Sequence, residues 1–345
     1  MPNLISPYRF IELSASLPVI DVRSPGEYVK GHIHGAFNLP LFTNEERSVI
    51  GTLYVKSGKD IAVKEGLEMV GKKFGFFISE IEKLVPDKEM LVHCWRGGMR
   101  SESLAWFFEK LGHKVSLLQG GYKSYRSFIR KEFSKPMNIL LIGGMTGSGK
   151  TELLNRIAAK GQQIIDLEAL ANHKGSSFGH LGQKVQPTTE QFENDLFDQW
   201  NSLNIEKALW LEYESKQVGK IFMPDPFHEA MLRGVLIKID IPRSCRIKRL
   251  VNEYACFEME LLEAVLLHLK QSMGTLQCKK AIEALQRSDF ETVADISLDY
   301  YDKTYQTALE KRPVKVVHKL EFENDDMLVN ADRLLTFARV HKLLP

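Results

Sequence analysis

The feature that most constrains this chain is a glycine-rich loop between an apolar segment and a helix-forming segment. Residues 138–144 read NILLIGG, residues 144–151 read GMTGSGKT, and residues 152–161 read ELLNRIAAKG. A strand that turns through glycines into a helix presents successive backbone N–H groups to phosphate oxygens, and the helix N-terminus favours their negative charge. This P-loop pattern predicts a phosphate- or diphosphate-binding site. Its residues are Gly144, Gly147, Ser148, Gly149, Lys150 and Thr151.

Lys150 and Thr151 extend what this loop can bind, because the lysine supplies positive charge and the threonine hydroxyl can bind Mg²⁺. Two carboxylates end the next predicted strands, Asp166 after QQIID and Glu212 after ALWLE. Each is a candidate general base or metal-shell ligand, and each is equally well explained as a strand-end residue in a turn. The polar loop 172–179 has the composition of a segment that closes over a ligand, or of an ordinary surface turn.

Apolar segments alternate with helix-forming segments in both halves of the chain. The first half has predicted strands at 18–24, 89–94 and 114–121, and a helix over 101–112 that ends at a glycine. The alternation indicates an α/β fold with parallel sheets in both halves. Further strands are predicted in the second half at 138–144, 162–168, 207–214 and 234–242.

Four segments follow from this pattern. The first is an α/β domain over 1–130, and the second is a basic interdomain segment over 131–137. The third is the P-loop domain over 138–242, and the fourth is a mostly helical region over 243–345 that we expect to pack on the P-loop domain. The basic stretch that leads to Pro136 is expected to be helical rather than a flexible linker.

Composition excludes several classes of protein. The chain has 345 residues, 44% hydrophobic and 26% charged, with net charge +2, which is typical of a globular protein. No apolar run reaches the length that spans a bilayer, about 18–20 residues. The N-terminal residues show no secretory signal. We therefore expect a cytoplasmic protein without membrane attachment. Its four cysteines lack CxxC spacing, so neither a zinc site nor a disulfide framework is predicted.

Two clusters of basic residues could bind a polyanion through its phosphates. One lies within 122–135 and the other within 243–249. A solvated helix face explains either cluster equally well. Tyr122 and Tyr125 lie in the first cluster and could stack on bases, although a role in the protein core is the simpler explanation. The candidate nucleic-acid contacts are Lys123, Arg126, Arg130, Arg243, Arg246 and Arg249.

A cysteine loop is the second chemical feature. Residues 93–103 read HCWRGGMRSES, so Cys94 leaves a predicted strand and precedes a predicted helix. Loop N–H groups, the helix dipole and the two arginines would all favour a thiolate, which makes Cys94 a candidate nucleophile facing an anion site. Cys245, Cys256 and Cys278 are expected to be inert buried cysteines. The loop residues are Trp95, Arg96, Gly97, Gly98, Met99 and Arg100.

Two stretches resemble rhodanese (sulfurtransferase) domains: DVRSPGEYVKGHIHGAFNLP at 21–40 and the cysteine loop. The resemblance implies that Cys94 is the catalytic carrier, that Asp21 and Arg23 are structural, and that the two histidines of the first motif fix a turn rather than bind a metal. One departure is clear. Five residues separate Cys94 from Arg100, where the common rhodanese loop has four. The longer loop resembles that of rhodanese-fold phosphatases and would admit a tetrahedral phosphate.

The strings HCWRGGMRSESLAW, LQGGYKSYR, GGMTGSGKTELL and IDLEALANHKGSSFG together resemble the tRNA 2-selenouridine synthase family, in which a rhodanese domain is fused to a P-loop domain. The resemblance covers approximately residues 5–240. It implies a transferase that acts on wobble 2-thiouridine of tRNA. Geranyl diphosphate first alkylates the sulfur. Selenium from selenophosphate, carried on Cys94 as a selenosulfide, then replaces the thioether to give 2-selenouridine.

The same resemblance implies the co-substrates and partners. No tightly bound cofactor is expected, although Mg²⁺ could accompany the diphosphate. Selenophosphate requires an enzyme that produces it. The unpaired anticodon loop suits such a reaction, because its bases can be splayed out without breaking a helix. We assign geranyl diphosphate to the P-loop, where Lys150 would neutralise the departing diphosphate.

Three other functions remain open from the sequence. The chain could be a sulfurtransferase fused to an ATP-dependent small-molecule kinase, since PRSCRIKR after the strand 234–242 resembles the arginine-bearing lid of such kinases. It could be a rhodanese-fold cysteine phosphatase that uses the longer loop. It could also be a non-catalytic polyanion-binding module in which Cys94 senses redox state.

Overall fold

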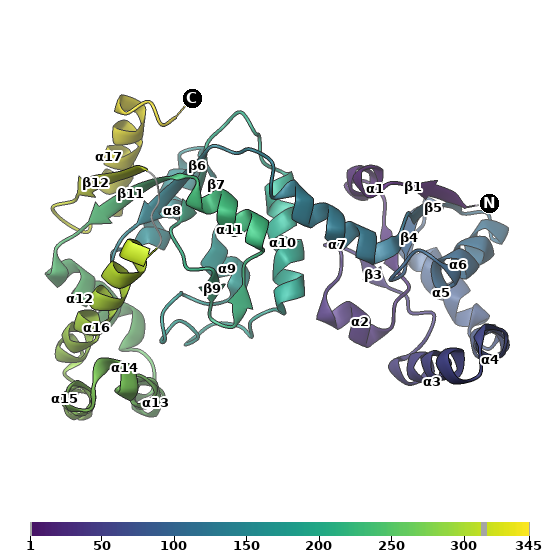
Figure 1. The fold of residues 1–345 in the computed structure, drawn as a ribbon, viewed down its shortest axis with the longest axis horizontal. Helices are drawn as coiled ribbons and strands as arrows, with labels where there is room; N and C mark the ends of the chain where they lie inside the picture. The colour runs from purple at the N-terminus through teal and green to yellow at the C-terminus, as the bar shows by residue number, and fades with distance from the viewer. Residues whose placement is uncertain (1, 312–315, 345) are drawn as a thin grey trace. The chain divides into compact units, whose positions relative to one another are not determined.

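Two five-stranded parallel sheets organise the chain, which a computed structural model describes over residues 2–311 and 316–344 (Figure 1). The described residues form two compact units, which divide between Glu132 and Phe133. We call them the first unit and the second unit. The division falls within the basic segment that the sequence marked as the seam. No helix in the described part of the chain is long and apolar enough to cross a membrane.

The first unit has the sheet order β1-β5-β4-β2-β3, and all its strand pairs are parallel. The α/β expectation for this half is confirmed, and the cysteine loop lies between β4 and α6. The elements are β1 (Asn3–Ile5), α1 (Pro7–Ser14), β2 (Val19–Asp21), α2 (Pro25–Lys30), β3 (Phe37–Asn38), α3 (Asn44–Lys56), α4 (Lys59–Gly71), α5 (Phe74–Leu84), β4 (Glu89–His93), α6 (Met99–Lys110), β5 (Lys114–Leu118) and α7 (Gly121–Glu132).

Helices cover both faces of this sheet, as burial of apolar parallel strands requires. On one face, Phe77 of α5 and Phe108 of α6 join strand residues such as Val92 in one apolar cluster that also contains Cys94. On the other face, α1 packs against α7, and the Phe10 ring of α1 lies 6.1 Å from the His93 ring. The basic stretch that leads to Pro136 is helical, as expected, only as far as Glu132, where α7 ends.

The second unit has the sheet order β12-β11-β6-β8-β7, again with only parallel pairs. Its elements are β6 (Ile139–Gly143), α8 (Lys150–Ala159), β7 (Gln163–Ile164), α9 (Leu167–Ala171), α10 (Thr189–Asn201), β8 (Leu209–Glu212), β9 (Gln217–Val218), β10 (Ile221–Phe222), α11 (Asp225–Leu232), β11 (Val235–Asp240), α12 (Arg243–Tyr254), α13 (Met259–His268), α14 (Lys270–Met273), α15 (Thr275–Gln286), α16 (Phe290–Lys311), β12 (Val316–Glu321) and α17 (Met327–Val340).

The C-terminal part of the chain completes this sheet. β12 pairs with β11 over its whole length, and α17 packs beside α8 in the core of the second unit (Figure 1). The sequence analysis treated 243–345 as mostly helical and did not identify β12. A second correction concerns the predicted strand 162–168. It is only two residues long as β7, because Asp166 caps the helix that starts at Leu167.

The order of strands places one loop at a special position. β6 lies in the middle of the sheet, between β11 and β8, and the chain leaves its carboxyl end through the P-loop. Ligands of open parallel sheets bind at the carboxyl ends of the strands, where neighbouring connections diverge. Glu212 ends β8, so its side chain and the P-loop emerge at the same edge.

Candidate active sites

The P-loop adopts the conformation that its glycines require. Gly147 and Gly149 have φ values of +77° and +72°, which L side chains rarely adopt, and Gly149 is the residue before α8. A Cβ on Gly149 would also lie 2.5 Å from Met327 Cε. Ser148 is buried and its Oγ has no hydrogen-bond partner in the described structure. The loop is therefore a tight turn that ends at a helix N-terminus, the geometry that binds phosphate.

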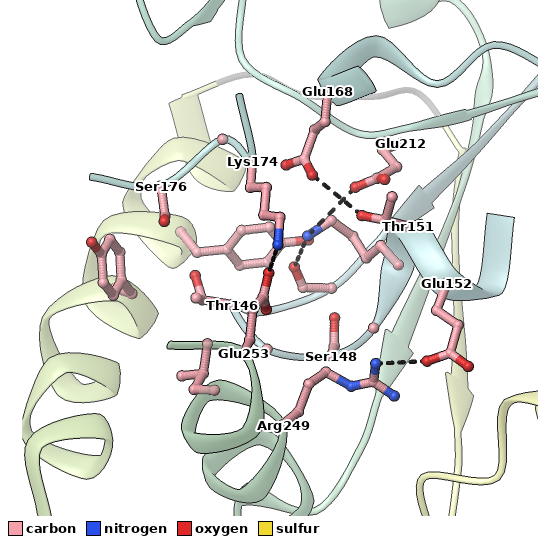
Figure 2. Close-up of a pocket in the computed structure, with 18 of the residues that line it drawn as sticks. Thr146, Ser148, Thr151, Glu152, Glu168, Lys174, Ser176, Glu212, Arg249 and Glu253 are labelled. Carbon is pink, nitrogen blue, oxygen red and sulfur yellow. Dashed lines mark hydrogen bonds and ion pairs between the residues drawn. The ribbon is translucent and has the colours of Figure 1, made fainter. Parts of the chain in front are cut away.

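Three carboxylates face this loop: Glu168, Glu212 and Glu214 offer oxygens that all lie within 4.8 Å of one another. Figure 2 shows Glu168 and Glu212 directed toward Thr151, whose Oγ1 lies 3.3 Å from a Glu168 oxygen. Both Glu212 oxygens are buried and have no hydrogen-bond partner among the residues that the structure describes. Lys150 Nζ lies 4.0 Å from one of them. A single lysine cannot neutralise three acids.

The charges of this cluster perturb one another. Burial raises the pKa of Glu168 to about 9, and the Glu212 and Glu214 charges act in the same direction. Burial also raises the pKa of Glu212 to about 7, with Lys150 opposing the shift. A divalent cation would satisfy the two Glu212 oxygens that lack a hydrogen-bond partner among the described residues, and oxygen ligands beside a P-loop threonine are what Mg²⁺ prefers. The residues present therefore fit a Mg²⁺ ion that accompanies a phosphate group.

The sequence analysis named only part of this cluster. Glu212 belongs to it, but the Asp166 carboxylate accepts a hydrogen bond from Ala169 N and caps α9. Asp166 is therefore corrected from a metal-shell candidate to a helix-capping residue. Glu168 and Glu214 were missed. The available signal was spacing, because each lies two residues beyond a carboxylate that the analysis did choose.

A cavity of about 900 Å³ surrounds these groups. One wall is the loop that follows α9, where Lys174 points across the cavity toward Glu253 of α12 (Figure 2). The loop 172–179 thus lines the site, which agrees with its interpretation as a ligand-binding loop rather than an ordinary surface turn. The lining also carries apolar and hydroxyl-bearing surface. It includes the side chains of Tyr213, Tyr254, Tyr300, Tyr301 and Tyr305.

The arginines of α12 are held by acids. Arg246 is buried, binds Asp302 of α16 through two contacts of 2.8 Å, and donates to the P-loop carbonyl of Thr146. Arg249 binds Glu152 and Asp325 and lines the cavity. Arg243 binds Asp295 and Asp299. All three arginines fix α12 to its neighbours. Burial removes Arg246 from any polyanion surface, whereas contact of Arg243 and Arg249 with tRNA stays a prediction.

The cysteine loop of the first unit packs backbone against backbone. Gly97 has φ +65°, and a Cβ there would lie 2.8 Å from Gly121 N. A Cβ on Gly121 would lie 2.4 Å from Gly97 N and 2.5 Å from Cys94 O. Tyr122 N donates to Cys94 O at 2.8 Å, which ties the loop to α7. The glycines on both sides of this contact therefore hold the loop in one conformation.

The sulfur of Cys94 has a defined environment. Cys94 is only 2% exposed, and the Ser101 hydroxyl lies 3.2 Å from its Sγ, where it can donate to a thiolate. The Arg100 guanidinium is bound by a carboxylate. It binds Glu27 at 2.8 Å, and this contact holds the pKa of Glu27 below its usual range although burial opposes it. Arg96 is exposed. The nearest polar partner of the thiol is therefore a hydroxyl rather than a guanidinium.

Buried groups beneath the loop have structural roles. Asp21 and Arg23 form a fully buried ion pair, and Arg23 also donates to Gly31 O at 2.7 Å. The Arg23 guanidinium lies 3.8 Å from the centre of the Tyr122 ring. Tyr122 and Tyr125 are buried in this core, so the interpretation as base-stacking residues is wrong. The His32 ring stacks on the Tyr28 ring, with centroids 3.9 Å apart, just before the turn that contains His34 and Gly35.

The remaining candidate residues differ in how exposed their side chains are. In α7, Lys123 and Arg130 are exposed, whereas Arg126 is only 9% exposed and is corrected from the list of tRNA contacts. Trp95 packs 5.7 Å from the Tyr122 ring, and Met99 is exposed. Cys278 is buried, as expected, but Cys256 is exposed at the end of α12, contrary to the expectation of a buried cysteine.

Comparison with known proteins matches a family model to each unit. The model of the tRNA 2-selenouridine synthase AAA domain matches residues 137–288, and the model of the rhodanese-like domain matches residues 6–128. A tRNA 2-selenouridine synthase of Shewanella frigidimarina is 31% identical over 338 residues, which cover 87% of this chain and 90% of the relative. One of Nitrosomonas europaea is 35% identical over 248 residues, covering 70% of this chain and only 64% of the relative's length. The chain therefore belongs to the tRNA 2-selenouridine synthase family.

Proposed function

We propose that this chain converts 2-thiouridine at the wobble position of tRNA to 2-selenouridine, through an S-geranyl intermediate. The observation that carries the proposal is the presence, in one chain, of a Mg²⁺-competent P-loop site and a buried thiol, Cys94, five residues before Arg100. A 2-thio sulfur is a poor leaving group, and alkylation converts it to a good one. Two sites with different chemistry are therefore needed for the exchange.

The first step belongs to the P-loop cavity. The 2-thio sulfur attacks the first carbon of geranyl diphosphate, the carbon–oxygen bond breaks, diphosphate leaves with the electron pair, and the base loses its N3 proton. Loop N–H groups and Lys150 bind the departing charge. Glu168, Glu212 and Glu214 would hold the Mg²⁺, which neutralises diphosphate when bound. The tyrosine-rich wall of the cavity offers surface for the hydrocarbon chain.

The second step belongs to Cys94. Selenium in selenophosphate is already at the oxidation level of selenide, so a selenosulfide on Cys94 would require an additional two-electron oxidant. Attack by the thiolate on phosphorus requires none. The sulfur–phosphorus bond forms, the phosphorus–selenium bond breaks, and selenide leaves with the electron pair. Water later cleaves the sulfur–phosphorus bond and restores the thiol. We therefore revise the implied role of Cys94, from carrying selenium to releasing it.

The released selenide completes the exchange. It adds to C2 of the S-geranyl base, the carbon–sulfur bond breaks, and geranylthiolate leaves, while N3 regains a proton. The spacing of five residues between Cys94 and Arg100 supports a loop that admits a tetrahedral phosphate, and the Ser101 hydroxyl lies within hydrogen-bond distance of the attacking sulfur. Selenophosphate would come from an enzyme that makes it in the cytoplasm.

The test supplies geranyl diphosphate and selenophosphate, singly and together, to the full chain with 2-thiouridine-containing tRNA, and identifies the nucleosides by mass. We expect a geranylated nucleoside with the first co-substrate alone and 2-selenouridine only with both. Cys94→Ser should stop selenium entry and leave geranylation intact, whereas Lys150→Ala should slow geranylation about 100-fold or more. Cys256→Ser is the matched control. Selenium incorporation by Cys94→Ser would refute the role of Cys94.

One observation also supports a second function. The Mg²⁺-competent acids and the Arg249 guanidinium beside the P-loop would also suit ATP, as in a small-molecule kinase. The same preparation distinguishes the two functions. ATP hydrolysis without tRNA, combined with no geranylated nucleoside, would support the kinase, whereas protection of the second unit by geranyl diphosphate but not by ATP would exclude it.

A further inference from the structure

A second cavity lies in the first unit, and the P-loop site shares none of its residues. Its volume is about 410 Å³, within the range of small-molecule sites. It lies between α3, α4 and the start of α6. Its walls are almost entirely hydrocarbon. The apolar lining residues are Leu41, Phe42, Ile50, Tyr54, Leu67 and Val70. We call this cavity the apolar groove.

Exposed apolar side chains border the groove. Leu67 of α4 is 61% exposed, Tyr54 of α3 is 53% exposed, and Met99 at the start of α6 is 46% exposed. Helix α3 buries none of its residues in the core. A helix pair that turns such side chains toward an open cavity gains stability when an apolar ligand covers them.

The groove ends at the cysteine loop. Arg96, Met99 and Arg100 of that loop and of α6 line it. Three residues of its wall, Leu41, Phe42 and Val70, belong to the same apolar cluster as Cys94. A chain in the groove would therefore place the atom at its head close to the loop where selenium is released.

The charge at this end limits the head group. Arg47 and Arg100 both bind Glu27, at 3.1 and 2.8 Å. Arg96 is exposed and forms no ion pair within residues 2–311 and 316–344. One uncommitted cation suits a single backbone phosphate of a nucleic acid. It is a poor match for a free diphosphate, for which the P-loop offers a lysine, loop amides and Mg²⁺-competent acids.

We propose that the apolar groove binds the prenyl chain of the S-prenylated nucleoside during selenation, with the thioether at the cysteine loop and a tRNA phosphate near Arg96. This inference rests on the proposed function. It assigns the hydrocarbon chain a separate site for the second step, and it explains why an alkyl group much larger than methyl is used. Burial of the chain makes the larger alkyl group a recognition element as well as part of the leaving group.

The test uses the full chain, selenophosphate, and tRNAs that carry chemically prepared S-geranyl-2-thiouridine or S-methyl-2-thiouridine. We expect wild type to select the S-geranyl tRNA at least tenfold in kcat/KM. Gly51→Phe should abolish this selectivity, because Gly51 lines the groove and a Cβ there meets no atom within 4 Å. Leu67→Gln should weaken the selectivity by making the wall polar.

The matched control variants change residues of the same two helices that do not line the groove. Thr52→Phe adds the same ring to α3, and Ile61→Gln makes the same polar change on α4, where Ile61 is 54% exposed. Both controls should keep the wild-type selectivity. The S-methyl tRNA should react at similar rates with all variants, which shows that each one is folded and that Cys94 is active.

The outcomes separate this inference from the function on which it rests. If wild type forms no 2-selenouridine from S-geranyl tRNA, the proposed function fails and the inference fails with it. If wild type reacts but Gly51→Phe keeps full selectivity, only the groove assignment is overturned. If that result comes with a wild-type dimer that Gly51→Phe dissociates, the occupant of the groove is a second copy of the chain.

Discussion

Neutralising Glu212 should change how the stability of the second unit depends on pH. Burial raises the pKa of Glu212 from 4.5 to about 7, so the folded unit binds a proton that the unfolded chain releases between these values. The free energy of unfolding should therefore fall as pH rises through this window. At about 1.4 kcal/mol per pH unit, the loss is about 3 kcal/mol by pH 7. Glu212→Gln carries no charge and should remove this part of the slope.

The assay is urea unfolding at pH 5 and pH 7 with EDTA present. Trp200 and Trp210 lie in the second unit, and Trp95 and Trp106 in the first. A background in which Trp95 and Trp106 are replaced by phenylalanine therefore makes fluorescence report the second unit alone.

Mg²⁺ should reproduce the effect of Glu212→Gln, because a cation between the carboxylates stabilises their ionised form. Glu206→Gln, an exposed change just before β8, is the control and should retain the wild-type slope. Equal slopes for wild type and Glu212→Gln in EDTA would refute the reasoning. A wild-type slope that Mg²⁺ leaves unchanged would refute the assignment of the metal site.

Three further predictions test individual contacts. Gly121→Ala should lower the stability of the first unit by about 2–4 kcal/mol and stop selenation but not geranylation, since φ is +61° and its Cβ would meet the cysteine loop; urea unfolding and nucleoside analysis check this. Ser101→Ala should slow selenation about tenfold through loss of its hydrogen bond to Cys94, with geranylation rates as the internal control. Asp302→Asn should destabilise the second unit by about 3 kcal/mol and weaken diphosphate binding, measured by calorimetry, because it leaves Arg246 beside the P-loop without its carboxylate.

The loops that bind phosphate could be predicted from the sequence because their conformations are local. Glycines at 147 and 149 permit the positive φ values of the P-loop, and the strand before it and the helix after it follow from apolar periodicity. The same holds for Cys94, which leaves β4 and enters a loop with a glycine of positive φ. Neither loop requires knowledge of distant residues to be recognised.

Partners distant in the chain could not be predicted in this way. In the sequence, three arginines lie three residues apart on one helix: Arg243, Arg246 and Arg249. Only the packing of α12 against α16 brings acids to Arg243 and Arg246, and these acids are Asp295, Asp299 and Asp302. These acids give two of the candidate tRNA contacts a structural role that the sequence did not show. In the same way, Arg100 looked free in the loop until α2 placed Glu27 beside it.

What the sequence alone determined is therefore the pair of chemical loops and the α/β alternation that carries them, since short-range backbone preferences decide both. Tertiary structure decided which carboxylates gather at the P-loop, because Glu168 of α9 reaches Glu212 and Glu214 only when α9 and the end of β8 meet at one edge of the sheet. It also decided the apolar groove, because α3 and α4 leave hydrocarbon side chains beside the cysteine loop only after both helices pack on the first unit.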